Sequence, residues 1–177
     1  MAKNNIKSKK GFTIIEVVLV LAIAGLIFLM VFVALPALQR GQRDTQRRDD
    51  MARFLSQINQ YQANNNGKVP SNYSTFIKNY LKAGGDTFED PSTGSTYKIY
   101  GDTSNDGSNA GTVVTCDSST CNGEDDVNSV GESTERGIIY VYTNATCEGE
   151  NPKYIQGDRK IAIRIKLEGA GTYCGHN

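Results

Sequence analysis

The sequence predicts an α+β protein: one long N-terminal α-helix packed on a C-terminal head that contains an antiparallel β-sheet. Three observations predict it. An apolar run at residues 12–38 holds a single charge, and apolar residues then recur at helical spacing as far as Tyr61. The second half of the chain holds short alternating runs between segments rich in Gly, Ser, Thr, Asn and Asp, a composition that favours strands and loops.

The 177 residues suffice for a membrane segment and one modest domain. The net charge is zero, but its distribution is uneven. Four lysines precede the apolar run and five arginines follow it: Lys3, Lys7, Lys9, Lys10, Arg40, Arg43, Arg47, Arg48 and Arg53. From residue 67 onward acidic residues outnumber basic ones by 15 to 10, which argues against a nucleic-acid surface on the head.

The apolar run is long enough to cross a membrane. Residues 17–38 match the length of about 20 residues that a helix needs to span the hydrocarbon core. The lysines before the run predict that this end stays in the cytoplasm, so the head faces outward. An ordinary secretory signal is cut after its apolar region, but here the small residue Gly11 lies before it. A cut after Gly11 would remove only the basic leader and leave a free amine on Phe12.

Glu16 is the one charge in this run, and a carboxylate inside a membrane is costly. An amine on Phe12 would lie one helical turn away and would neutralise it, within one chain or between neighbouring chains. Glu16 is then a register device for helix assembly. The simpler interpretation is a membrane anchor whose glutamate reaches the headgroups, and the physical argument alone leaves both open.

Residues 9–18, KKGFTIIEVV, resemble the class III signal of type IV prepilins and pseudopilins. The resemblance extends over about residues 9–62. It implies that a prepilin peptidase cuts between Gly11 and Phe12 and methylates Phe12, and that Glu16 guides docking into a filament. One departure is that Pro36 lies further beyond Gly25 than in most pilins, which leaves the position of any loosened helical segment open.

The resemblance also divides the chain. Residues 1–11 are expected to be a leader peptide, residues 12–38 the transmembrane and filament-core helix, residues 39–66 the amphipathic half of that helix, and residues 67–177 the head. In the amphipathic half a stripe at helical spacing is expected to lie on the sheet: Met51, Phe54, Leu55, Ile58 and Tyr61.

The arginines after the apolar run have two interpretations. They are solvated or hold the helix at the membrane surface, which we favour, or they pair with acidic groups on a neighbouring subunit. DNA binding through them is disfavoured because Asp44, Asp49 and Asp50 are interleaved with them.

In the head, turn residues at 64–67 are expected to end the long helix, and Ser71 or Asn72 to cap a short one that ends at the glycine pair 84–85. Strands are expected at residues 96–100, 112–115, 137–143 and 160–167. The last of these alternates between isoleucines or leucine and the basic residues Lys160, Arg164 and Lys166. This alternation predicts a sheet with one face on the core and the other in water.

Four cysteines, Cys116, Cys121, Cys147 and Cys174, predict two disulfides in a chain that leaves the cytoplasm. Three pairings are possible, and we favour Cys116–Cys121 with Cys147–Cys174. A zinc site is the rival interpretation, but the spacing suits it poorly.

No catalytic, cofactor-binding or metal-binding residue set is expected. His176 is the single histidine, and no glycine-rich loop has the lysine and the flanking elements that phosphate binding needs. The acidic loops at residues 101–111 and 117–126 lack EF-hand spacing, so calcium binding is a weak hypothesis against plain surface loops. Asn72 and Asn144 lie in glycosylation sequons, a short and common motif.

The resulting hypothesis is a type IV pilin that passes from a single-pass inner-membrane pool, with its N-terminus in the cytoplasm, into an extracellular filament used in adhesion, twitching motility or DNA uptake. Its implied partners are copies of itself, the prepilin peptidase, the assembly platform with minor pilins, and the membrane before assembly. A minor pilin or pseudopilin of a type II secretion or competence system is the alternative within the family. A membrane-anchored binding module without a filament is the alternative outside it.

Overall fold

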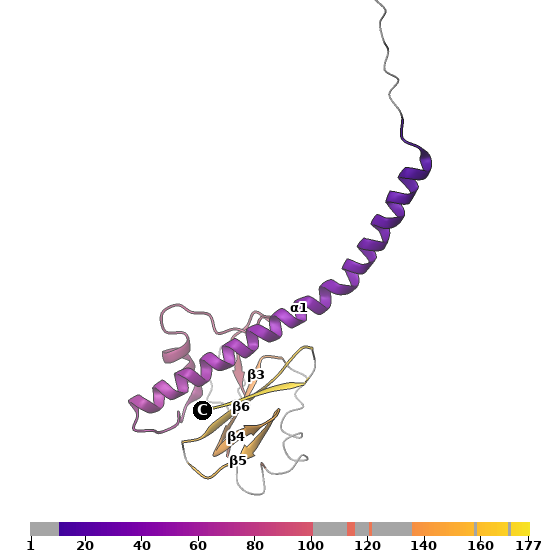
Figure 1. Ribbon diagram of the computed structural model, residues 1–177. Coiled ribbons are helices and arrows are strands. Elements are labelled where there is room, and N and C mark those ends of the chain that lie inside the picture. The colour runs from indigo at the N-terminus through magenta and orange to yellow at the C-terminus, as the bar shows by residue number, and fades with distance from the viewer. Residues whose placement is uncertain (1–10, 101–112, 116–120, 122–135, 158, 170) are drawn as a thin grey trace, which may run out of the picture. The chain divides into compact units, whose positions relative to one another are not determined.

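The computed structural model describes residues 11–100, 113–115, 121, 136–157, 159–169 and 171–177 (Figure 1). The chain forms two compact units, residues 1–39 and residues 40–177, each of which is described separately. The helix α1, Ile14–Asn64, contributes to both.

In the first unit α1 is apolar and exposed on all sides. Phe12 is 90% exposed, and the large apolar side chains that follow it are exposed throughout. Within the described residues this helix alone is long and apolar enough to cross a membrane. Pro36 lies inside the helix, which continues through it. The predicted long apolar helix is thereby confirmed.

In the second unit α1 covers one face of the sheet (Figure 1). Met51, Phe54 and Ile58 are fully buried there, so the predicted amphipathic stripe is confirmed. The helix ends where Asn66 and Gly67 take positive φ values of 56° and 79°. The Gly67 N–H donates to the Gln62 carbonyl at 2.7 Å, which satisfies one of the last free carbonyls of the helix.

A short helical segment follows, as expected. It begins as α2, Tyr73–Phe76, and continues as the π-helix η1, Ile77–Leu81. Asn72 caps it, since its Oδ1 accepts a hydrogen bond from the Thr75 N–H at 2.9 Å. Its Tyr73 and Phe76 rings pack on Phe54 of α1, with the Phe76 ring edge-on at a centroid distance of 5.5 Å.

The main sheet has the order β1-β3-β6-β7, and β2 also pairs with β3. Its strands are β1, Lys98–Ile99; β2, Val114–Thr115; β3, Ile138–Thr143; β6, Ile161–Lys166; and β7, Thr172–His176. The pairs β3–β6 and β6–β7 are antiparallel, as expected. Both β1 and β2 run parallel to β3, so the sheet is mixed rather than purely antiparallel.

The face of the sheet away from α1 is also buried, contrary to the expectation of a solvated face. Ala162 is fully buried and Arg164 is only 8% exposed. A hairpin of β4, Ala145–Glu148, and β5, Asn151–Tyr154, lies on this side and contributes to a second apolar cluster with Tyr140 and Tyr142 (Figure 1). The alternation in β6 identified the two faces correctly but did not reveal this second cover.

Cys147 and Cys174 form a disulfide with a Cα–Cα distance of 5.8 Å, the pairing that we favoured. It joins the β4–β5 hairpin to β7. Cys121 is disulfide-bonded as well, while Cys116 lies outside the described residues, so the pairing Cys116–Cys121 stays a prediction.

Candidate functional site

The peptide bond between Gly11 and Phe12 lies in exposed backbone that is not helical. Residues 11–13 precede α1, which begins at Ile14. The helix thus begins two residues inside the segment 12–38 that was expected to form the transmembrane and filament-core helix. The residues predicted for cleavage thus lie outside the first hydrogen-bonded turn.

Glu16 folds back onto the residue that precedes the helix. Its Oε2 accepts hydrogen bonds from the Thr13 N–H at 3.0 Å and from the Thr13 hydroxyl at 2.9 Å. The Glu16 N–H in turn donates to the Thr13 hydroxyl oxygen at 3.4 Å. This reciprocal pattern is a capping box, which satisfies N–H groups that the first turn of a helix leaves free.

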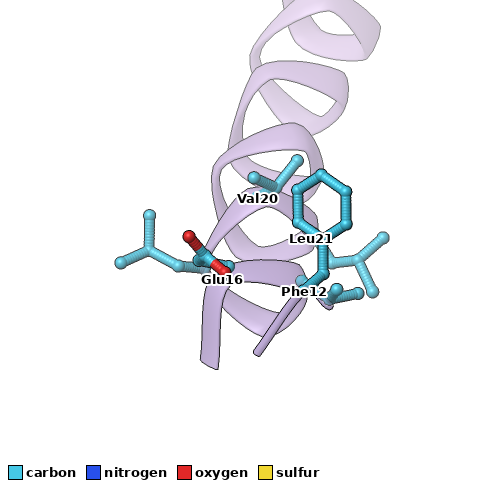
Figure 2. Close-up of a pocket in the computed structure, with 6 residues that line it drawn as sticks. Phe12, Glu16, Val20 and Leu21 are labelled. Atoms are coloured by element: carbon cyan, nitrogen blue, oxygen red, sulfur yellow. The ribbon is translucent and has the colours of Figure 1, made fainter. Parts of the chain in front are cut away.

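Phe12 and Glu16 lie beside the same shallow hollow on the first turns of α1 (Figure 2). The other side chains that line it are apolar: Val17, Leu19, Val20 and Leu21. The Glu16 carboxylate is therefore a single anionic group in an apolar surface. Such a surface suits lipid, or another apolar helix that brings a cation with it.

A second polar site lies in the head, where α1 meets two loops. Arg47 is fully buried and its guanidinium contacts three carboxylates. Its Nε donates to Asp90 at 2.6 Å, its Nη1 to Asp44 at 3.1 Å and its Nη2 to Glu168 at 2.9 Å. Arg43 adds a two-nitrogen contact to Glu168, with Nη2 at 2.7 Å. We call these five residues the Arg47 cluster.

The Arg47 cluster joins three segments that are far apart in sequence. Asp44 accepts the backbone N–H groups of Glu168 and Gly169 at 2.7 and 2.8 Å, which fixes the turn after β6 on α1. Asp90 accepts the N–H of Ser92 at 2.9 Å, which closes the turn before β1. The cluster thus ties α1 to the turn after β6 and to the turn before β1.

Each buried charge in the cluster is compensated. Burial alone raises the pKa of Asp90, but hydrogen bonds from Arg47 and Ser92 outweigh it and the net pKa lies below its usual value. Hydrogen bonds from Arg43 lower the pKa of Glu168 by more than its burial raises it. Burial lowers the pKa of Arg47, but its bonds to Asp90 and Glu168 raise it by more. Arg47, Asp90 and Glu168 are therefore ionised at neutral pH.

This geometry corrects our interpretation of the arginines that follow the apolar run. Arg47 is buried rather than solvated and pairs with carboxylates of its own chain, and Arg43, whose side chain is 31% exposed, pairs with Glu168. Arg53 likewise contacts Asp50 at 3.5 Å. Arg48 is exposed and its guanidinium lies 5.9 Å from the centre of the Tyr173 ring.

Two features escaped the sequence analysis although a signal for each was present. Thr13 and Glu16 have the spacing of a capping box, Thr-x-x-Glu, directly before an apolar run. Asp44 and Arg47 lie N-terminal to Met51 at the same helical spacing, so they extend the buried stripe by two positions. Nothing local in the sequence pointed to Asp90 or Glu168 as their partners.

Three further candidates from the sequence were the single histidine, a metal site and the acidic loops. His176 is exposed on β7 and its Nδ1 accepts the Cys147 N–H at 3.3 Å. Within the described ranges, no three His, Cys, Asp or Glu side chains are grouped as metal ligands. The acidic loops considered for calcium fall almost wholly on residues 101–112, 116–120 and 122–135, outside the description.

One comparison with known proteins gave a match. A family model described as the prokaryotic N-terminal methylation motif matches residues 6–32. The matched segment contains Gly11, Phe12, Thr13 and Glu16, and it confirms the N-terminal signal on which the sequence resemblance was based. The motif is of a structural kind and not an enzyme family. Neither the curated proteins nor the solved structures that were compared with the chain gave a match.

Proposed function

We propose that this chain, whose N-terminal segment carries the class III signal of type IV pilins and pseudopilins, is the structural subunit of a type IV pilus. The signal implies processing by a prepilin peptidase and assembly into a pilus or pseudopilus. The apolar helix beside it fits a membrane-anchored precursor. The finer assignment, a major subunit in a surface filament used for adhesion, twitching motility or DNA uptake, is our proposal.

The observation that carries the proposal is the arrangement of residues 11–16. An exposed Gly11–Phe12 peptide precedes the helix, and one carboxylate lies in an otherwise apolar surface a few residues later. Cleavage there places an amine on Phe12 at the start of that surface. In the filament, the apolar helices bundle and the Phe12 amine of one subunit meets Glu16 of another. Pairing removes most of the cost of two charges in an apolar environment.

The remainder of the chain supports a head that stays folded outside the cell. The Cys147–Cys174 disulfide suits an oxidising compartment, and the Arg47 cluster holds the head on α1. A subunit that adds to a helical filament by head-to-tail contacts needs such a rigid body, because identical contacts must repeat along the filament.

Mass spectrometry of filaments sheared from cells tests the proposal directly. We expect an abundant chain that begins at Phe12, with or without a methyl group. A processed chain found only in membrane fractions would assign it instead to the minor pilins or to the pseudopilins of a secretion or competence system. A chain that still begins before Gly11 would refute processing and leave a membrane-anchored binding module.

The role of Glu16 is tested by Glu16→Leu, with Ile15→Leu as the control in the same turn. We expect Glu16→Leu to leave a processed subunit in the membrane and to remove filaments from the sheared fraction, while Ile15→Leu forms them at the original yield. Filaments at normal yield with leucine at position 16 would exclude the proposed docking contact.

A further inference from the structure

The Glu16 carboxylate uses one oxygen within its own chain and leaves the other open. Oε2 accepts both donors of Thr13, its N–H and its hydroxyl. None of the described residues donates to Oε1. The side chain, which would otherwise sample many rotamers, is therefore held over the first turn by two hydrogen bonds to a charged acceptor.

Both donors remain after processing. The Thr13 N–H belongs to the peptide bond between Phe12 and Thr13, which a cut after Gly11 leaves intact. The hydroxyl belongs to the Thr13 side chain. The capping box therefore exists in the precursor and can persist in the mature subunit, whose new amine lies one residue before it.

The surroundings make this support necessary. Apart from Glu16, the side chains lining the hollow are apolar, and an ionised carboxylate among such side chains is costly unless it is hydrogen-bonded. Thr13 supplies these hydrogen bonds without neutralising the charge, so the carboxylate keeps its attraction for a cation. A cation from another chain can then bind Oε1 without displacing Thr13.

From this geometry, and on the basis of the function proposed above, we propose that Thr13 is a positioning residue for filament docking. It holds the Glu16 carboxylate in a fixed orientation, with Oε2 bound to its own first turn and Oε1 presented to the Phe12 amine of a second copy of the chain. The Glu16 side chain is already ordered in the free subunit, so less conformational entropy is lost when two subunits dock.

The test compares Thr13→Val with Thr13→Ser in full-length chains expressed in the same cells. Valine keeps the shape and the backbone N–H but lacks the hydroxyl, whereas serine keeps the hydroxyl and caps helices as well as threonine. We expect Thr13→Val to lower filament yield about tenfold, as the loss of a hydrogen bond to a charged group would. Thr13→Ser should stay within about twofold of the original chain. In both variants the membrane pool should begin at Phe12.

Equal filament yields for Thr13→Val and Thr13→Ser would overturn the inference and leave the proposed function intact. A Thr13→Val chain that still carries its leader would also overturn it, because Thr13 would then act in cleavage and not in docking. Normal filaments from Glu16→Leu would instead refute the proposed function itself, and the role of Thr13 with it.

Discussion

Replacing Arg47 by methionine removes the guanidinium that bonds both Asp90 and Glu168. Methionine has a similar length and no charge, so the change isolates the loss of the cation. Arg47 is fully buried, and the side chains of Asp90 and Glu168 are 1% and 2% exposed. Glu168 keeps Arg43, whereas Asp90 is left with hydrogen bonds from Ser92 and Thr93.

The expected magnitude follows from this burial. Removing one partner from a buried ion pair costs about 3–5 kcal/mol, because the other charge remains without compensation. Small domains are stable by only about 5–15 kcal/mol, so Arg47→Met removes a large share of the free energy of unfolding of the head. With a urea slope of about 2 kcal/mol per molar, the midpoint falls by about 2 M.

The assay is urea unfolding of the full chain in mild detergent with its disulfides intact, followed by the near-ultraviolet circular dichroism of the tyrosines, since the chain has no tryptophan. Arg48→Met is the control, because Arg48 is exposed on the same helix and its guanidinium lies over the Tyr173 ring in a cation–π arrangement that is worth about 0.5–1 kcal/mol. Adding Asp90→Asn to Arg47→Met should recover part of the loss. Equal, small losses for Arg47→Met and Arg48→Met would refute the reasoning.

The pH dependence gives an independent check on the same cluster. Asp90 and Glu168 have pKa values below those of the unfolded chain, so folding favours their ionised forms. Their contribution to stability is complete above about pH 5, and it is lost as the pH falls through the unfolded values of about 4 toward the lower folded ones. In Arg47→Met the free energy of unfolding should depend less on pH over this range. Once the guanidinium is removed, burial raises the pKa of Asp90.

Two further changes probe the head. Tyr73→Phe should leave the free energy of unfolding unchanged or raise it by about 1 kcal/mol, because the buried Tyr73 hydroxyl has no hydrogen-bond partner among the described residues; a loss above that amount in the urea assay would show that the hydroxyl is bonded. Replacing Cys147 and Cys174 together by serine should lower the free energy of unfolding by about 3.5 kcal/mol, because the disulfide closes a loop between residues 27 positions apart. Thermal unfolding of the oxidised variant beside the oxidised original chain measures this second effect, and reductant should destabilise the original chain by at least as much, because it also opens the disulfide of Cys121.

The N-terminal segment could be predicted from its sequence because its determinants are local. A charge pattern, one glycine, one glutamate and an apolar run lie within about 30 consecutive residues, and both the helix and the signal follow from them. The position of the long helix on the sheet was predictable for a similar reason, because Met51, Phe54 and Ile58 recur at helical spacing.

The parts that escaped prediction depend on contacts between distant residues. The strand β5 contains Pro152 and the strand β7 contains Gly175, two residues that usually argue against a strand. Arg47 looked like one of several surface arginines because its partners lie 43 and 121 residues further along the chain. The face of β6 that carries Arg164 looked solvated because the hairpin that covers it was not recognised as a hairpin.

The sequence distance between Arg47 and Glu168 sets the order in which the head can be completed. If the chain is exported from its anchor helix onward, as the proposed function requires, Arg47 emerges early, and Glu168 reaches the same compartment only after another 121 residues have crossed. The strand β3 pairs directly with β1, β2 and β6, and β7 joins the sheet through β6. The sheet therefore also needs β6 before it is complete. Folding that relies on such distant contacts is slow. During such an export the head would stay incomplete while the helix anchors it, and chains that stop before β6 and β7 would lack the residues that complete the sheet and the Arg47 cluster.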